Sequence, residues 1–295
     1  MSEPVIALNK LTKSYGKHRG IEEISFSVER GEIFGFIGPN GAGKSTTIRT
    51  LMGLLKPTGG TASVFGLDCG RQASEIAKDV GYLPSENCYY NSMKVKEMLL
   101  YTAELYGVAS HNRMEALAER LNLDLSRRIG DLSLGNKKKV GIISALLPSP
   151  KLLIMDEPTS GLDPLIQQTF YDLLKEENER GTTIFLSSHV LSEVQRLCDR
   201  VAILRKGRLV GVQSMNELRE NGYKKISLTA KNAIPENFFS VPGTANLEWS
   251  KSKTSVSFMF SGTVMMMMNQ LHRLELEDIL IEEPSLEEIF LHYYE

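Results

Sequence analysis

The stretch GPNGAGKST (Gly38–Thr46) decides the fold of this chain. It matches the pattern G-x-x-x-x-G-K-[ST], in which small residues let backbone N–H groups turn inward and wrap phosphates. The apolar run IFGFIG before it predicts a strand, and the run STTIRTLMGLL predicts a helix whose positive end points at the phosphates. This order of strand, loop and helix predicts a binding site for ATP or GTP. The alternative is a glycine-rich turn that holds no ligand.

The chemistry of the loop residues suggests individual roles. Lys44 would reach the β- and γ-phosphates, Ser45 would ligate Mg²⁺, and Thr46 would add a phosphate contact. The residues expected to hold the nucleotide here are Gly38, Pro39, Asn40, Gly41, Ala42, Gly43, Lys44, Ser45 and Thr46.

Two adjacent carboxylates end a second apolar run, LLIMDEP (Leu152–Pro158). Successive side chains of a strand point to opposite sides, so Asp156 and Glu157 cannot do the same job. Asp156 would hold Mg²⁺ through water, and Glu157 would orient or deprotonate the attacking water. The alternative is a pair that only caps the next turn. Because the chain also carries a phosphate loop, the pair predicts a hydrolase and not only a binding protein.

His189 directly follows a third apolar run, TTIFLSS. A side chain that leaves the carboxyl end of a strand faces the nucleotide edge of a parallel sheet. Alone, a histidine at this place is more typical of a structural role. Beside Lys44 and Glu157, it predicts a neutral imidazole that hydrogen-bonds the γ-phosphate or the water. Lys44, Glu157 and His189 are therefore the predicted catalytic residues.

The order of the patterns predicts the architecture. Strands that alternate with helices over residues 1–215 indicate an α/β fold of the P-loop nucleotide hydrolase type, with a mostly parallel sheet. Residues of about 90–148 show helical periods only, which predicts an inserted helical subdomain. Residues 216–295 change to period two and predict a small C-terminal α+β domain. One face of its last helix would carry Leu286, Ile289, Phe290 and Tyr293.

Composition excludes several classes of protein. Lys and Arg number 34 against 36 Asp and Glu, so the formal charge of -2 gives no basic field for nucleic acid. Cys69, Cys88 and Cys198 have no C-x-x-C spacing, which favours small core residues in a reducing compartment over a disulfide or zinc framework. The N-terminus lacks the order of a signal peptide, and no apolar run reaches the ~18 residues that cross a bilayer, so we expect a soluble protein. The run Met265–Met268 predicts a helix buried on most sides, rather than a soft binding surface.

The motifs in their order resemble those of the ATP-binding subunit of ATP-binding-cassette (ABC) transporters over roughly residues 4–215. They are Tyr15 in LTKSYG, the phosphate loop, GYLP, LSLGN, LLIMDEP, SGLD and SSH. GTPases would carry an NKxD motif to read guanine, and NKKK at Asn136–Lys139 is not one. The C-terminal PSLEEIFLHYY resembles the tail of bacterial drug, antibiotic and lantibiotic export ATPases, whose membrane subunit is a separate chain.

The resemblance implies an ABC-type helical subdomain, the ligands ATP and Mg²⁺, and two protein partners. One is an integral-membrane permease, which would hold the chain peripherally on the cytoplasmic face of the cell membrane. The other is a second copy of the chain, in a head-to-tail homodimer in which Ser133 and Gly135 of one copy face the ATP of the other. Tyr15 would stack on adenine, and Asp163 in SGLD would link the two sites.

Two departures from the family pattern are visible. LSGGQ is replaced by LSLGN, so that Leu134 stands where the family uses the backbone freedom of a glycine, and Asn136 is shorter than Gln. The Gln that the family places after GYLP is also missing, and Ser85, Glu86 or Asn87 could supply the oxygen for the metal. The cluster Lys137–Lys139 would either add positive charge near the triphosphate or form a solvated helix face.

Two functions remain open on this basis. The first is an ATP-hydrolysing subunit that drives a permease, with export of an antibiotic, peptide or lipid-like substrate. The second is a nucleotide-gated regulatory or interaction protein with little turnover, because both departures fall on parts that act in the closed dimer. The presence of Glu157 and His189 favours the first.

Overall fold

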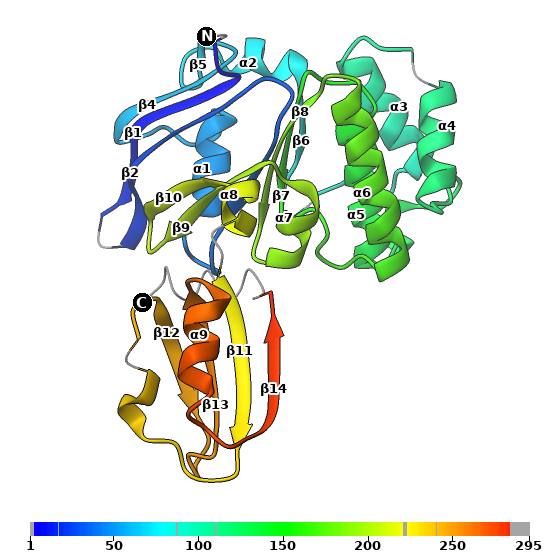
Figure 1. Ribbon diagram of the computed structural model, residues 1–295. Helices are drawn as coiled ribbons and strands as arrows, with labels where there is room; N and C mark the ends of the chain where they lie inside the picture. Colours follow the sequence, from blue (N-terminus) through cyan, green and yellow to red (C-terminus); the bar gives the residue numbers. More distant parts are fainter. Residues whose placement is uncertain are drawn as a thin grey trace. The chain divides into compact units, whose positions relative to one another are not determined.

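The computed structural model describes residues 3–283 except 17, 87, 110, 221, 222 and 240. The chain divides into two compact units, Met1–Ser214 and Met215–Glu295 (Figure 1). The predicted apolar face of the last helix, at Leu286, Ile289, Phe290 and Tyr293, lies outside the described residues.

A six-stranded sheet forms the centre of the first unit, in the order β10-β9-β3-β8-β7-β6. Its strands are β3 (Ile33–Ile37), β6 (Val80–Leu83), β7 (Leu152–Asp156), β8 (Thr183–Ser188), β9 (Arg200–Arg205) and β10 (Arg208–Ser214). All neighbours pair in parallel except β10, which pairs antiparallel to β9. Every residue of β3, β7 and β8 is buried, as expected for parallel strands covered on both faces. The predicted α/β fold of P-loop type is confirmed.

A second, antiparallel sheet has the order β2-β1-β4-β5. Its strands are β1 (Ile6–Tyr15), β2 (His18–Val28), β4 (Gly59–Val64) and β5 (Leu67–Asp68). Helix α1 (Lys44–Leu51) contacts strands of both sheets (Figure 1). The ring of Phe26 in β2 stacks on Phe34 of β3 and on Phe185 of β8, at centroid distances of 5.3 and 6.1 Å. This aromatic core joins the two sheets.

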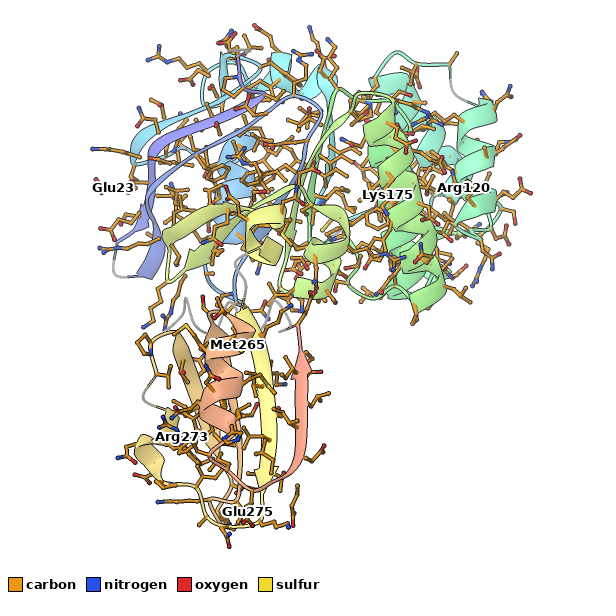
Figure 2. The ribbon with its side chains drawn as sticks, in the orientation of Figure 1. Glu23, Arg120, Lys175, Met265, Arg273 and Glu275 are labelled. Atoms are coloured by element: carbon orange, nitrogen blue, oxygen red, sulfur yellow. The ribbon has the colours of Figure 1, made fainter. Side chains whose placement is uncertain are left out.

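Helices cover the central sheet and fill the segment between β6 and β7. They are α2 (Ala73–Ile76), α3 (Val95–Leu105), α4 (His111–Arg120), α5 (Leu134–Leu146), α6 (Pro164–Glu179) and α7 (Leu191–Leu197), with 3₁₀ turns at Ala77–Asp79 and Ile129–Asp131. Helices α3 and α4 pack on α5 (Figure 1). Arg120 of α4, labelled in Figure 2, makes a two-bond pair with Glu176 of α6, with N–O distances of 2.6 and 2.7 Å.

The second unit has a four-stranded antiparallel sheet in the order β12-β13-β11-β14. Its elements are α8 (Met215–Glu220), β11 (Tyr223–Ala230), a 3₁₀ turn at Glu236–Phe239, β12 (Thr244–Trp249), β13 (Ser255–Ser261), α9 (Val264–Leu271) and β14 (Leu276–Glu282). Helix α9 covers one face of this sheet (Figure 1). Phe239 and Phe258 pack at its centre with their ring centroids 4.5 Å apart.

Some expectations about buried residues are wrong. Met267 is buried, but Met265, Met266 and Met268 are 69%, 49% and 50% exposed, because α9 lies on the sheet along one side only (Figure 2). The prediction of a helix buried on most sides therefore fails. Cys69 and Cys198 are buried core residues as expected, whereas Cys88 is exposed. Among the described residues, no helix combines the length and the apolar character that crossing a membrane requires.

Candidate functional site

The loop that joins β3 to α1 adopts a conformation that depends on glycine. Gly41 and Gly43 have φ angles of +77° and +109°, in the left-handed region that residues with a side chain rarely adopt. A Cβ atom at Gly43 would also lie 2.5 Å from Cγ2 of Ile21. Gly43 is the N-cap of α1, so the free N–H groups of the first helical turn begin where the loop ends. This is the geometry that binds anions at a helix N-terminus.

A cavity of about 390 Å³ opens over this loop. It is lined by Gly20, Asn40, Gly41, Gly43, Lys44, Ser45, Thr46, Ser85 and Glu157. The ammonium group of Lys44 is buried in it, where Nζ donates to the carbonyl of Gly38 at 2.6 Å and lies 3.1 Å from Oε1 of Glu157. The structure therefore brings together two residues that are far apart in the sequence: Lys44, predicted to reach the phosphates, and Glu157, predicted to act on the attacking water.

Glu157 connects Lys44 to His189. Its Oε2 lies 2.6 Å from Nδ1 of His189, while Oε1 faces Lys44. Its φ angle of +50° is uncommon for a residue with a side chain and turns the chain sharply out of β7. The N–H of Glu157 donates to Oγ of Ser187 at 3.1 Å, which helps to hold this conformation. The three predicted catalytic residues thus form one contact chain.

Asp156 points to different partners from Glu157, in agreement with the alternation expected at a strand end. It is opposite Ser187 in the pairing of β7 with β8, and the hydroxyl of Ser187 donates to its Oδ1 at 2.6 Å. The other oxygen, Oδ2, is buried and has no hydrogen-bond partner among the described residues. A buried carboxylate oxygen without a donor is suited to a cation.

Tyr15 lies apart from this cavity. It ends β1, is 42% exposed, and has Nζ of Lys13 5.4 Å from its ring centroid. Its neighbours Lys13 and Ser14 line a second hollow of about 600 Å³, which also includes Gly20. Because Gly20 lines both cavities, the two are adjacent.

Sequence analysis missed several residues of these cavities. Gly20, Lys206 and Arg208 line them but belong to no motif. A Cβ atom at Gly20 would lie 1.7 Å from the carbonyl oxygen of Lys13, so only glycine fits. The sole local signal was the turn at Lys206 and Gly207, which places both basic residues at one end of a hairpin.

Comparison with known proteins gives a consistent answer. The family model described as "ABC transporter" matches residues 21–160. The bacitracin transport ATP-binding protein BcrA of Bacillus licheniformis is 38% identical over 226 residues, which cover 75% of this chain and 73% of that protein. The linearmycin resistance ATP-binding protein LnrL of Bacillus subtilis is 31% identical over 302 residues, which cover 97% of both. The chain belongs to the ABC transporter family.

Solved structures agree with this assignment. An ATP-binding subunit of an ABC transporter superposes with a TM-score of 0.69 at 32% identity, over 73% of this chain and 92% of that one. The present chain is likewise an ATP-binding subunit of the drug and antibiotic exporter type, and an ATPase. The resemblance drawn from the sequence is confirmed.

The ABC signature segment begins α5, away from the phosphate loop of its own chain. Ser133 is the N-cap, and its Oγ accepts a hydrogen bond from the N–H of Asn136 at 3.3 Å. Ser133 is exposed, and neither it nor Gly135 lines the cavity that contains Lys44. One copy of the chain therefore does not bring the signature residues to its own phosphate site.

Leu134 does not disturb the backbone of this ABC ATPase. It is the first residue of α5, has no positive φ, and is 76% exposed. In this chain the backbone at Leu134 therefore has a conformation that any residue can adopt, and the effect of Leu134 on the signature stays a prediction. The glycine that the geometry requires is Gly135, where a Cβ atom would lie 2.6 Å from the carbonyl oxygen of Gly161 in the SGLD loop.

Gly135→Ala should therefore destabilise the protein, because the start of α5 and the SGLD loop would have to separate. We expect the free energy of unfolding to fall by ~1–3 kcal/mol, as for other overpacked contacts. The matched control is Leu134→Ala at the neighbouring exposed position. This substitution should change the free energy of unfolding by less than about 0.5 kcal/mol. Urea denaturation of both variants measures the difference. Equal stability of the two variants would show that the Gly161 loop can move away from the added methyl group without lowering the free energy of unfolding.

Two further motifs of this ABC ATPase have defined places. Asp163 of SGLD is the N-cap of α6, and its Oδ1 accepts from the N–H of Ile166 at 3.0 Å. After GYLP, Ser85 lines the phosphate cavity and Glu86 is exposed, while Asn87 lies outside the described residues. The interpretation of Lys137–Lys139 as a solvated helix face is wrong for Lys138 and Lys139, which are buried.

Proposed function

We propose that this chain is the ATP-hydrolysing subunit of an exporter, which drives a separate membrane permease and moves an antibiotic, peptide or lipid-like substrate. The names of BcrA and LnrL refer to bacitracin transport and linearmycin resistance, and the similarity to LnrL extends through the C-terminal unit. The observation that carries the proposal is the position of Glu157 between Lys44 and His189 at the cavity. A protein that only binds nucleotide has no need of this carboxylate.

The residues of the site divide the reaction between them. The phosphate loop and Lys44 hold the β- and γ-phosphates of ATP, and a phosphate oxygen competes with Glu157 for the ammonium group of Lys44. Once Lys44 is bound to phosphate, Oε1 of Glu157 is available to orient the attacking water and accept its proton. His189 donates from Nδ1 to Oε2, which holds the carboxylate in place. Tyr15 stacks on adenine beside the second hollow.

Mg²⁺ fits the donor set of this site. Ser45 lines the cavity, and Asp156 carries the unpartnered buried oxygen Oδ2. A hydroxyl and a single carboxylate suit Mg²⁺, which keeps several waters and takes further oxygens from substrate phosphates. When bound, the ion neutralises charge on the phosphate oxygens of ATP. Ser45 would hold it directly, and Asp156 through water.

The working unit is a head-to-tail homodimer. Ser133 and Gly135 of one copy complete the phosphate site of the other. Their position outside the cavity of their own chain supports this arrangement. Two exposed leucines at the first turns of α5 and α6, Leu134 and Leu165, would lose water contact in this arrangement. The permease holds the dimer on the cytoplasmic face of the cell membrane. Nucleic acid is not a partner.

Co-expression with the product of a neighbouring membrane-protein gene tests the exporter role. We expect the complex to sediment with membranes, to hydrolyse ATP faster than the isolated chain, and to raise the tolerance of cells to an exported antibiotic. Turnover at background even in the complex would favour the regulatory protein instead. Fast turnover without any change in the antibiotic tolerance of the cells would support the ATPase activity and exclude the tested antibiotic as the substrate.

Truncation before Tyr223 should leave ATP binding intact. Every residue that lines the two cavities lies in the unit Met1–Ser214. Isothermal titration with ATP should give the same Kd for the truncated and the full chain within about threefold. Loss of affinity on truncation would mean that the C-terminal unit is part of the ATP-binding fold.

A further inference from the structure

Two adjacent lysines are buried in α5, the helix that begins with the signature segment. The exposed fractions of Lys138 and Lys139 are 5% and 7%. Lysine is almost never fully buried without a partner, because an ammonium group removed from water is costly unless it meets oxygen atoms. Each of the two does meet one: Nζ of Lys138 donates to the carbonyl of Ser85 at 3.1 Å, and Nζ of Lys139 donates to the carbonyl of Asn122 at 3.5 Å.

The two contacts differ in where they lead. Ser85 lines the phosphate cavity together with Lys44 and Glu157, so Lys138 acts on a wall of the ATP site. Asn122 follows the last turn of α4 and lines none of the cavities described above. Lys138 and Lys139 are thus neighbours of equal chemistry and similar burial, of which only one touches the site.

Charge also connects Lys138 to the site. Burial lowers the pKa of Lys138, and the negative charges of Asp156 and Glu157 oppose this change. The ammonium group therefore feels both carboxylates that end β7. Lys138 belongs to α5, whereas Lys44, which contacts Glu157, belongs to the end of the phosphate loop.

We propose that Lys138 is a positioning residue of the ATPase. Its ammonium group fixes the backbone of Ser85 in the cavity wall and ties this wall to α5, the helix that presents Ser133 and Gly135. The segment after GYLP, which begins with Ser85, contains no glutamine. Lys138 of α5 holds this segment through its hydrogen bond to the carbonyl of Ser85. The inference rests on the proposed roles of the cavity residues in ATP hydrolysis.

The test compares Lys138→Met with the matched control Lys139→Met. Both variants remove one buried ammonium group from the same helix, and a general loss of stability affects both. Hydrogen exchange of the backbone amides at Ser85 and Glu86, without nucleotide, should become at least tenfold faster in Lys138→Met and stay at the wild-type rate in Lys139→Met. This measurement does not depend on turnover.

Kinetics supply the second measurement. Per folded molecule, kcat of Lys138→Met should fall about tenfold to a hundredfold, since a mutation outside the reacting groups that shifts the site by about 1 Å can cost about a hundredfold. The Kd for ATP should change less than about threefold, because Lys138 does not line the cavity. Lys138→Arg should regain most of the lost kcat, and Lys139→Met should keep kcat within about twofold.

The outcomes separate this inference from the proposed function. Equal exchange rates at Ser85 and Glu86 in the two methionine variants, or equal kcat values, would overturn the positioning role. A wild-type chain without turnover would overturn the proposed hydrolysis, and the exchange data would still decide whether Lys138 holds the loop. If Lys138→Met does not fold, Lys138→Gln takes its place. The glutamine side chain is polar, but it has no charge and is one bond shorter than that of lysine, so it should not replace the hold of the ammonium group on Ser85.

Discussion

Glu157→Gln should lose ATP turnover and bind ATP more tightly. Glutamine keeps the size of the side chain and an oxygen that can accept from Nδ1 of His189, but it cannot accept the proton of the attacking water. Removal of a positioned general base lowers kcat about 10²- to 10⁴-fold. The substitution also removes the carboxylate that lies 3.1 Å from Nζ of Lys44. A negative charge at this place would repel the bound triphosphate. Loss of one such charge strengthens ATP binding by ~1 kcal/mol, or about fivefold.

Steady-state turnover, ATP titration and size-exclusion chromatography with ATP and Mg²⁺ measure these effects. We expect Glu157→Gln to elute as a dimer with ATP and as a monomer without it. The control is Glu177→Gln, because Glu177 is likewise an ion-paired glutamate, but it is buried and pairs with Arg113 and Arg180 and does not line the cavity. It should lower stability and leave kcat per folded molecule unchanged. An ATP-loaded Glu157→Gln protein that stayed monomeric would count against the sandwich dimer.

Lys44→Ala should lose most of its affinity for ATP. In the wild type the ammonium group is already held in the loop by the carbonyl of Gly38 at 2.6 Å, so little conformational entropy is lost when phosphate binds. Hydrogen bonds to charged groups contribute ~1.5–3 kcal/mol each, so the Kd should rise roughly tenfold to a hundredfold. Lys151→Ala is the control, since Lys151 pairs with Asp79 at the surface. Wild-type affinity in Lys44→Ala would place the ATP site elsewhere.

The parts of the site that could be predicted from the sequence are those in which function depends on neighbours along the chain. Gly38–Thr46 needs only a strand before it and a helix after it, and Asp156 and Glu157 need only the end of a strand. The pairing of Glu157 with His189 depends on β7 lying beside β8, and strand order is not written in any local pattern. The roles proposed for these residues stay predictions until the variants are measured.

The features that sequence analysis misjudged depend on contacts between distant segments. Lys138 and Lys139 have the spacing and the charge of a solvated face, and they are buried only because carbonyl oxygens of Ser85 and Asn122 meet them. Gly20 is required by the carbonyl of Lys13 across a hairpin. The exposure of Met265 follows from which side of α9 the sheet covers, and an apolar run alone cannot define that side.

The position of β8 between β3 and β7 has a consequence for the newly synthesised chain. The ribosome delivers the phosphate loop early and Glu157 much later, and His189 follows 32 residues after Glu157. Lys44, Glu157 and His189 cannot meet until β8 has inserted between strands that precede it, a long-range pairing that forms slowly. A nascent or broken chain can therefore expose a phosphate loop without the means to split ATP. If these three residues act as proposed, ATP hydrolysis begins only with a completed sheet, and we expect fragments of this protein not to drain the energy supply of the cell.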